Sequence, residues 1–438
     1  MIEKEKQFAS HEFKYGRHLS NIKSMKRLTL IFITITSISI GQPSLSLDSC
    51  IRMAKRNYPL IKQSNLIDEN EKNNIQSDTK NWLPKLSFVS KASYQSEVVE
   101  FLGKSFPHDS YLAALDLEQT LFDGGQIHQQ KQLDKISGET ESLKNEVELY
   151  KLIDRIDQLF SSILLTRESI KTLNIYKEDI NNKKMIISAS VKNGILLQSN
   201  LDALEAEEFK SEQSLIEGKE NLNSLYLTLG MFIGKSVDDN TELAMDPIMN
   251  TSKSDEITRP EIKLFDSQKA LFEARHKLTN KNALPKIAVS GEGAYGRPGP
   301  NFLNQDIRFF AQAGISLKWN IGALYNFSNE KQNYTINKQM VDVQKEVFEF
   351  NLKTTMLTQT AQINSLKDIL EIDKKIIEKR ISIKETAASQ LANGSITSTD
   401  YLTESNAEMQ AVLNQKIHEI KLMNAISNYN SSKGLKNF

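Results

Sequence analysis

A glycine motif at residues 291–296 has the G-x-G-x-x-G spacing with which many proteins bind a dinucleotide. In such a site the glycines let a strand turn closely into a helix, and the amino end of that helix binds the pyrophosphate. Here the motif is followed by Arg-Pro-Gly-Pro at residues 297–300, a composition that does not form a helix. We therefore interpret the segment as the end of a strand that enters a loop, and we expect no nucleotide cofactor.

The other reactive side chains form no catalytic or metal-binding pattern. None of the histidines, at positions 11, 18, 108, 128, 276 and 418, has the spacing of a metal-ligand pair. The single cysteine, Cys50, can form no disulfide within the chain, and we interpret it as a small buried residue. Neither a cysteine–histidine arrangement nor a nucleophile elbow is present. The sequence therefore predicts a protein that is not an enzyme, with no catalytic residue, cofactor or metal site.

An acidic residue follows a glycine turn near the end of the chain. Thr397-x-x-Asp400 has the spacing of a capping box, in which a hydroxyl and a carboxylate bond the first backbone N–H groups of a helix. Ser199-x-x-Asp202 has the same spacing after an earlier glycine. One interpretation of Asp400 is therefore that it caps a helix.

The chain contains two copies of one pattern, about 200 residues apart. Leu-Pro-Lys-Leu at residues 83–86 returns as Leu-Pro-Lys-Ile at 284–287, and Asn-Gly at 193–194 returns at 393–394. A repeat this long exceeds the periods of solenoid proteins, so we expect two equivalent halves of one architecture. We assign the halves to residues 42–250 and 251–438.

Each copy predicts a long helix, a glycine turn and a shorter return helix. Proline is absent from about residues 125–190 and 323–391, and the return helices are expected over about 198–230 and 398–432. In both long helices apolar residues recur at three- and four-residue intervals, which is typical of a coiled-coil seam or a packing face. The two stripes are Leu149, Ile153, Ile156, Phe160 and Ile163, and Val343, Val347, Phe350, Thr354 and Leu357.

Before each long helix, apolar and polar side chains alternate. The alternation covers about residues 86–98, 111–120, 287–295 and 309–319, and it predicts four strands with one apolar face. Strands of about 10 residues with this pattern are typical of a membrane barrel, and an ordinary half-buried sheet is the alternative. Four strands cannot close a barrel, and lipid does not tolerate an open edge. A membrane barrel would therefore need strands from several chains.

Charge and hydropathy exclude two other classes. Lys+Arg and Asp+Glu both number 55, so no basic excess is available to bind a nucleic acid. A mean hydropathy of −0.43 excludes a multi-helix membrane protein. The unbroken apolar run at residues 28–40 follows Met-Lys-Arg at 25–27 and is too short for a membrane-spanning helix. It predicts a leader and signal peptide within residues 1–41, with Met25 as the expected start, and a short buried helix is the alternative.

The order and spacing of these motifs resemble the TolC-like outer-membrane efflux proteins over about residues 47–432. The resemblance is carried by the start at residues 45–51, the Gln-Thr-Leu-Phe-Asp-Gly-Gly run at 119–125 and the turn at 390–402. It implies an α+β membrane protein that forms a homotrimer, with a twelve-stranded β-barrel in the outer membrane continued by a twelve-helix periplasmic α-barrel. Such a channel is a passive exit duct for small molecules. Its partners are a periplasmic adaptor protein and an inner-membrane pump.

The resemblance also assigns roles near the two glycine turns. Acidic residues after the second turn surround the inner mouth in this family, so Asp400, Thr403 and Glu404 are the candidate periplasmic gate, with Thr403 in place of an acid. The family's Asp–Arg link between the tips is absent, because Asn200 and Ile396 occupy those positions. The expected adaptor-contact tips are Val191, Asn193, Gly194, Ile195 and Leu196, and Asn393, Gly394, Ser395 and Ile396.

Two other functions fit the sequence. One is the exit duct of a type I protein secretion system, which the sequence does not separate from efflux. The other, from a different class, is a periplasmic coiled-coil scaffold or adaptor whose strands form a soluble sheet. Heat-resistant oligomers in the outer-membrane fraction would favour the channel, and a soluble periplasmic protein would favour the scaffold.

Overall fold

The computed structural model describes residues 44–98, 100–101, 103–244 and 257–435. All of them belong to one unit of the chain, Ser44–Phe438. The predicted signal peptide within residues 1–41 and the expected boundary between the halves at residue 250 lie outside the described residues. None of the described helices is both long and apolar enough to cross a membrane.

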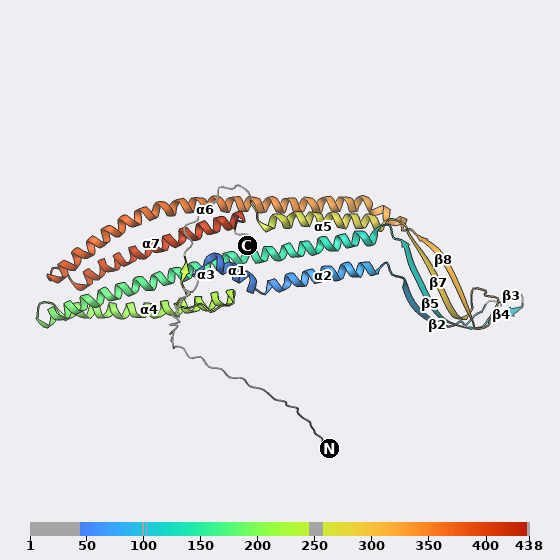
Figure 1. The fold of residues 1–438 in the computed structure, drawn as a ribbon, viewed down its shortest axis with the longest axis horizontal. Coiled ribbons are helices and arrows are strands. Elements are labelled where there is room, and N and C mark those ends of the chain that lie inside the picture. The colour runs from blue at the N-terminus through green and yellow to red at the C-terminus, as the bar shows by residue number, and fades with distance from the viewer. Residues whose placement is uncertain (1–43, 99, 102, 245–256, 436–438) are drawn as a thin grey trace, which may run out of the picture. The chain divides into compact units, whose positions relative to one another are not determined.

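The first half consists of two short helices, a strand pair and a helical hairpin (Figure 1). Two pairs of very short strands accompany them, β1 with β6 and β3 with β4. In chain order the elements are β1 (Leu45–Ser46), α1 (Leu47–Asn57), α2 (Leu60–Lys80), β2 (Lys85–Tyr94), β3 (Glu100–Phe101), β4 (Lys104–Ser105), β5 (Asp109–Phe122), α3 (Gln126–Lys192), α4 (Gln198–Ile233) and β6 (Leu243–Ala244).

The second half repeats this order of helix, strand pair and hairpin. Its elements are α5 (Pro260–Asn282), β7 (Lys286–Arg297), β8 (Arg308–Lys318), η1 (Ile321–Asn326), α6 (Phe327–Ala392) and α7 (Ser398–Lys433). The long helices α3 and α6 contain 67 and 66 residues, and the return helices α4 and α7 contain 36 each. The second long helix was expected to begin near Ala323, but a 3₁₀ helix, η1, comes first.

Asp123 and two glycines turn the chain from β5 into α3. The Asp123 carboxylate accepts hydrogen bonds from the N–H groups of Gly125 (2.8 Å) and Ile127 (2.7 Å). Gly124 has φ +72°, and a Cβ built on it would lie 2.7 Å from the Leu284 side chain. A positive φ and a close neighbour both favour glycine here, which explains the Asp-Gly-Gly sequence.

The four long strands form one antiparallel sheet in the order β2-β5-β7-β8. Each strand is connected along the chain to one helix of the helical layer. In this layer α3 packs against α2, α4, α5 and α7, and α6 packs against α5 and α7. Figure 1 shows the two hairpin turns at one end of this helical layer and the sheet at the other. The strands β2 and β8 are the two edges of the sheet.

Three apolar clusters stabilise the helical layer. The largest joins α1, α3 and α4 and includes Ile420 of α7. It buries Cys50 and the predicted α3 stripe from Ile153 to Ile163, in which Ile156, Phe160 and Ile163 are 0% exposed. A second cluster, around the fully buried Tyr401, lies near the hairpin turns and includes residues of α3, α4, α6 and α7. The third joins α6 to α7. These clusters pack the two hairpins against each other.

Helix α2 is attached to the layer mainly by polar contacts, since none of its residues is buried. The Asn145 amide of α3 donates to the Leu60 carbonyl (3.1 Å) and to the Ser64 hydroxyl (2.7 Å). At its other end, Asp78 is close to Asp134 of α3. Burial, and then the neighbouring Asp134, raise the pKa of Asp78 to about 6, while Lys131 opposes the shift. Two carboxylates thus meet where the helix joins the sheet.

The raised pKa predicts that α2 is held less firmly at neutral pH. The pKa of Asp78 rises from 3.8 to about 6 on folding, so the folded chain keeps a proton that the unfolded chain has released in this window. Its stabilisation is complete below about pH 3.8 and is lost as the pH rises through about 6. We expect amide exchange of α2, corrected for intrinsic rates, to be faster at pH 7 than at pH 5. Asp78→Asn should abolish the difference and the exposed-site control Asp68→Asn should keep it; equal corrected rates in the unaltered chain would contradict the prediction.

Candidate functional site

The two hairpin turns have the same backbone geometry. In the first, Gly194 (φ +72°) donates to the Val191 carbonyl and Ile195 to the Ser190 carbonyl, at 3.0 and 2.9 Å. In the second, Gly394 (φ +69°) donates to the Leu391 carbonyl and Ser395 to the Gln390 carbonyl, again at 3.0 and 2.9 Å. This pair of bonds is the Schellman motif, which needs a left-handed residue and explains both Asn-Gly sequences. Asn193 and Asn393 are the C-cap residues.

The first tip differs from the sequence prediction in how its return helix begins. Helix α4 starts at Gln198 with Leu197 as N-cap and no side-chain cap bond, so the expected Ser199 capping box is wrong. Ile195 and Leu197 are exposed, at 68% and 74%. Leu196, Val191 and Ile396 are instead partly buried against the apolar cluster near the turns. Leu197 is an exposed apolar residue that the analysis of the sequence did not single out.

The second tip has the predicted capping box. Thr397 N–H donates to the Asp400 carboxylate (2.9 Å), and Asp400 N–H donates to the Thr397 hydroxyl (3.2 Å). The hydrogen bonds from Thr397, through its side chain and then its backbone, lower the pKa of the Asp400 carboxyl from its usual value. Asp400 is therefore a fixed negative charge at neutral pH, and its side chain remains exposed to solvent.

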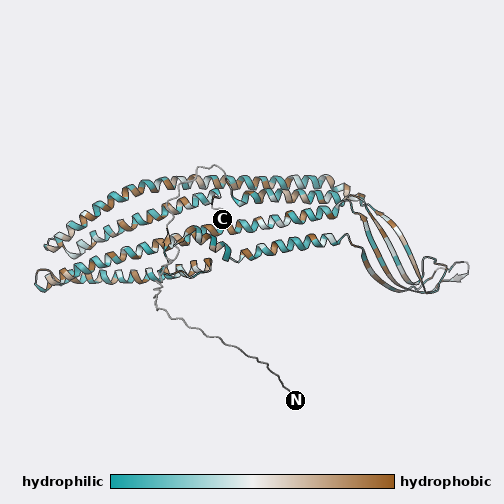
Figure 2. Ribbon diagram, viewed as in Figure 1, coloured by the Kyte–Doolittle hydropathy of each residue, from teal (hydrophilic) through white to brown (hydrophobic). Residues whose placement is uncertain are grey.

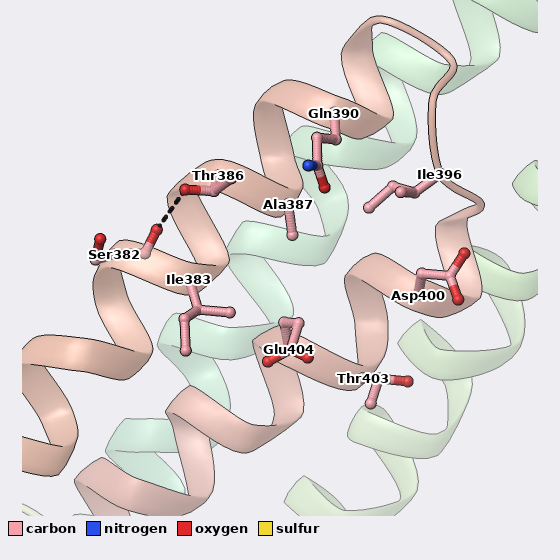
Figure 3. Close-up of a pocket in the computed structure, with 9 residues that line it drawn as sticks. All are labelled: Ser382, Ile383, Thr386, Ala387, Gln390, Ile396, Asp400, Thr403 and Glu404. Atoms are coloured by element: carbon pink, nitrogen blue, oxygen red, sulfur yellow. Dashed lines mark hydrogen bonds between the residues drawn. The ribbon is translucent and has the colours of Figure 1, made fainter.

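Asp400, Thr403 and Glu404 lie on one side of a groove between α6 and α7 (Figure 3). The groove has a volume of about 400 Å³, and Ser382, Ile383, Thr386, Ala387, Gln390 and Ile396 complete its walls. Arg380 of α6 donates to Glu404 at 3.1 Å, while the Thr403 hydroxyl donates to the Thr399 carbonyl at 3.0 Å. The three predicted gate residues thus lie together, but the negative charge of Glu404 is paired with the positive charge of Arg380.

The two tips are tied by a side chain that replaces the absent Asp–Arg link. The Asn200 amide oxygen of α4 accepts a hydrogen bond from the Ser398 N–H at the start of α7, at 2.8 Å. Ser398 is 0% exposed, so water does not compete freely for this bond. Asn200 and Ile396 occupy the positions of the absent link. Asn200 makes the hydrogen bond to Ser398, and Ile396 packs against the apolar cluster near the turns.

A buried polar network joins α3 to α6 and α7 next to the tips. The Asp179 carboxylate accepts from the Tyr401 phenol (2.7 Å), the Ser405 hydroxyl (3.2 Å) and Lys384 (3.3 Å). Burial, and then the bond to Asp179, raise the pKa of the Tyr401 phenol, which therefore stays protonated and donates. Lys384 also pairs with Glu408 at 3.3 Å, and the corresponding pair of the first hairpin is Lys184 with Glu208.

The sheet has one apolar face on which none of the described helices or strands packs. The register places Phe88 opposite Leu115, and Leu86 opposite Leu117, while the intervening residues point to the other face. Phe88 is 68% exposed and Leu86 is 69% exposed, which is unusual for residues of this size. Figure 2 shows hydrophobic and hydrophilic residues interleaved along these strands. The other exposed residues of this apolar face are Tyr94, Tyr111, Tyr295, Phe309, Ile315 and Leu317.

Aromatic residues gather at both ends of the apolar face. Tyr94, Tyr111, Tyr295 and Phe309 lie toward the loops that join the strands. At the junction with the helices, the exposed aromatic residues are Phe122 at the end of β5, and Trp82, Trp319 and Tyr325 in the segments that follow α2 and β8. Aromatic rings in two belts with aliphatic residues between them are the pattern of a membrane-facing sheet.

The stripe on α6 is exposed, although its counterpart on α3 is buried. Phe350 is 70% exposed, Val343 57% and Leu357 65%, in contrast to the buried Phe160 of α3. With Ile336, Met340 and Val347 they form what we name the α6 seam, which has the heptad spacing of a coiled coil. On α4 the apolar residues Phe209, Ile216, Leu227 and Met231 are exposed as well. The two apolar surfaces lie on different helices of one chain.

The glycine motif at residues 291–296 lies within β7, as expected, and no helix follows it. In the described part of the chain no group of three or more His, Cys, Asp or Glu side chains could hold a metal ion.

No family model and no curated protein matches the sequence. Solved structures do match. The outer membrane channel CmeC of Campylobacter jejuni is 14% identical with a TM-score of 0.65, over 89% of this chain and 85% of that one. The outer membrane protein VceC of Vibrio cholerae is 12% identical with a TM-score of 0.64, over 89% and 95%. The open state of the MtrE outer membrane channel of Neisseria gonorrhoeae is 12% identical with a TM-score of 0.65, over 89% and 88%.

The chain thus has the fold of these outer membrane channels along nearly the whole length of each. The predicted resemblance to TolC-like proteins is confirmed at the level of the fold.

Proposed function

We propose that this protein is a subunit of a trimeric outer-membrane channel, the passive exit duct of a tripartite efflux system for small molecules. The observation that carries the proposal is the exposed apolar face of the sheet with its two aromatic belts. A soluble scaffold would leave Phe88, Phe309 and their neighbours in water, whereas lipid covers such a face. Nothing in the sheet favours the scaffold interpretation.

The open edges of the sheet support assembly from several chains. A four-stranded sheet in lipid leaves the outward-pointing N–H and C=O groups on the free edges of β2 and β8 without partners, and each such group costs several kcal/mol. Pairing β8 of one copy with β2 of the next removes both edges, and three copies supply twelve strands. Each strand continues into the helical layer, so the same symmetry gives a twelve-helix tunnel in the periplasm.

The α6 seam supports the same arrangement. Its apolar residues need a partner helix outside the chain. Helix α4 exposes apolar residues as well, which also need to be covered. In a closed ring α6 of one copy packs beside the opposite edge of the helical layer of the next copy. The same threefold arrangement of copies thus covers the α6 seam and pairs the free edges of the sheets.

The hairpin tips are the proposed contact with a periplasmic adaptor and its inner-membrane pump. Ile195 and Leu197 offer exposed apolar anchors, and Gly194, Asn193 and the second tip at Asn393–Ile396 complete the surface. Val191 and Leu196 support the tip from within, because they pack on the cluster around Tyr401. Asp400, with Thr403 and Glu404 beside it, is the proposed periplasmic gate.

Removing the Asp400 charge should weaken the block of the channel by trivalent cations. A ring of three carboxylates attracts multivalent cations into the mouth, so Asp400→Asn is expected to weaken block by La³⁺ at least about tenfold in planar bilayers. Asp400→Ala should also raise the conductance, because it removes the cap bonds that fix the start of α7. Glu385→Gln is the matched control, since Glu385 is exposed on α6 but does not line the groove. Unchanged block would remove Asp400 from the gate.

The proposed channel is tested by reconstituting the purified protein in planar bilayers. Stable unit conductances that scale with salt concentration would support it. A protein that remains water-soluble and passes no current would contradict it and favour the periplasmic scaffold. Energy-dependent export of small dyes from cells would distinguish efflux from the duct of a type I secretion system.

A further inference from the structure

The face of the sheet opposite the apolar face carries more cationic than acidic side chains. Residues of the apolar face alternate with this second face, which in the proposed barrel lines the passage. The cationic residues of this face are Lys85, Lys91, Lys286, Arg308 and Lys318. Its acidic residues are Asp116, Glu118 and Glu292. Arg297 and Asp109, which form an ion pair, lie on the apolar side at the loop end. The lining therefore has a positive excess in every chain.

The charges are ordered in tiers along the strands. Near the loops, Lys91 is opposite Leu112 and Arg308 is opposite Gly296, so no acid lies in their row. Near the helices, Lys286 lies directly opposite Lys318. Between the two tiers, Asp116 lies opposite Glu292, whose carboxylate accepts from Gln312 at 3.1 Å. A carboxylate row is thus enclosed between two cationic tiers.

Like charges lie opposite one another in two rows of this face. Such pairs are destabilising, and they are Lys286 with Lys318 and Asp116 with Glu292. Lys286 also donates a hydrogen bond to the Gln126 side chain of α3, which does not neutralise its charge. Small anions that pass the tier would relieve this repulsion, as they do in pores lined by rings of Lys or Arg. Lys85 lies opposite Glu118, so this part of the charge is balanced locally. The charges that remain are the four cations of the two tiers and the two carboxylates between them, so the cations are in excess.

We infer that the barrel favours the passage of small anionic solutes, and that Lys91, Arg308, Lys286 and Lys318 set this preference. The inference rests on the proposed channel and is distinct from the acidic mouth formed around Asp400. The periplasmic mouth and the barrel then favour ions of opposite charge. Cations collect at the periplasmic mouth, and anions cross the outer-membrane section more readily.

The test is the reversal potential of the reconstituted channel in a KCl gradient. The double variants Lys91→Gln/Arg308→Gln and Lys286→Gln/Lys318→Gln should each lower the chloride-to-potassium permeability ratio at least about threefold. Lys91→Arg/Arg308→Lys keeps the charge and should leave the ratio unchanged. The Asp400→Asn variant should shift the ratio in the opposite direction, toward chloride.

Two results would overturn the inference, and only one of them would also overturn the proposed channel. Normal conductance with the wild-type ratio in both Gln variants would overturn the anion preference and leave the channel standing. No current from the folded wild-type trimer would overturn the proposed channel and the preference together. Native mass measured on each variant shows that it has kept its assembly.

Discussion

Replacing Phe350 with aspartate is expected to dissociate the trimer into folded monomers. Phe350 is 70% exposed in the single chain, so the fold of the monomer does not depend on it. In the proposed ring it is buried against the next copy, and loss of that burial costs about 2 kcal/mol per interface. The buried, unpaired carboxylate adds a further penalty. Native mass measured in mild detergent should therefore fall to that of one chain while the helical circular dichroism is kept.

Thr355→Asp is the matched control for this variant. Thr355 is exposed on the same helix but lies off the α6 seam, so the added charge should leave the trimer intact. If Phe350→Asp leaves the trimer unchanged, the seam does not lie between copies of the chain. Loss of the trimer in both variants would instead show that α6 is merely sensitive to charge.

Replacing Phe88 with arginine should prevent the sheet from entering the membrane. Phe88 lies between the two aromatic belts on the apolar face, where an arginine in contact with lipid costs about 2–4 kcal/mol. A trimer carries this cost three times, so we expect most of the protein to be lost from the outer-membrane fraction. The measurement is the amount that resists alkaline extraction from fractionated envelopes.

The neighbouring residue gives a close control. Ser87 points to the opposite face of β2, so Ser87→Arg adds the same charge to the lining and should be tolerated. Equal insertion of Phe88→Arg and Ser87→Arg would mean that the apolar face does not contact lipid. Equal loss of both would mean that β2 tolerates no arginine at all, and lipid contact would then need another test.

Periodicity was sufficient to predict the elements but not their partners. The stripes of α3 and α6 look alike in sequence, and both are helical, yet Phe160 is buried within the chain and Phe350 is exposed. Spacing reports which side of a helix is apolar, and only tertiary packing determines what covers it. The difference between the two halves is what indicates an interface between copies.

At the tips, too, the sequence predicted the local turns but not the contacts between distant residues. The Asn-Gly sequences predicted both turns, because few residues adopt a positive φ. The Ser199 box was wrong since Leu197 takes the N-cap position, and the bond from Ser398 to Asn200 joins residues about 200 positions apart. No local pattern signals such a contact. The Tyr401–Asp179 bond was missed for the same reason.

The location and native mass of the mature protein test the central claim most directly. Envelopes are fractionated, the protein is extracted in mild detergent, and its mass is measured by light scattering corrected for detergent. The proposed channel predicts a trimer in the outer-membrane fraction. A water-soluble monomer or dimer in the periplasm would contradict it, because the apolar face of the sheet would then never meet lipid.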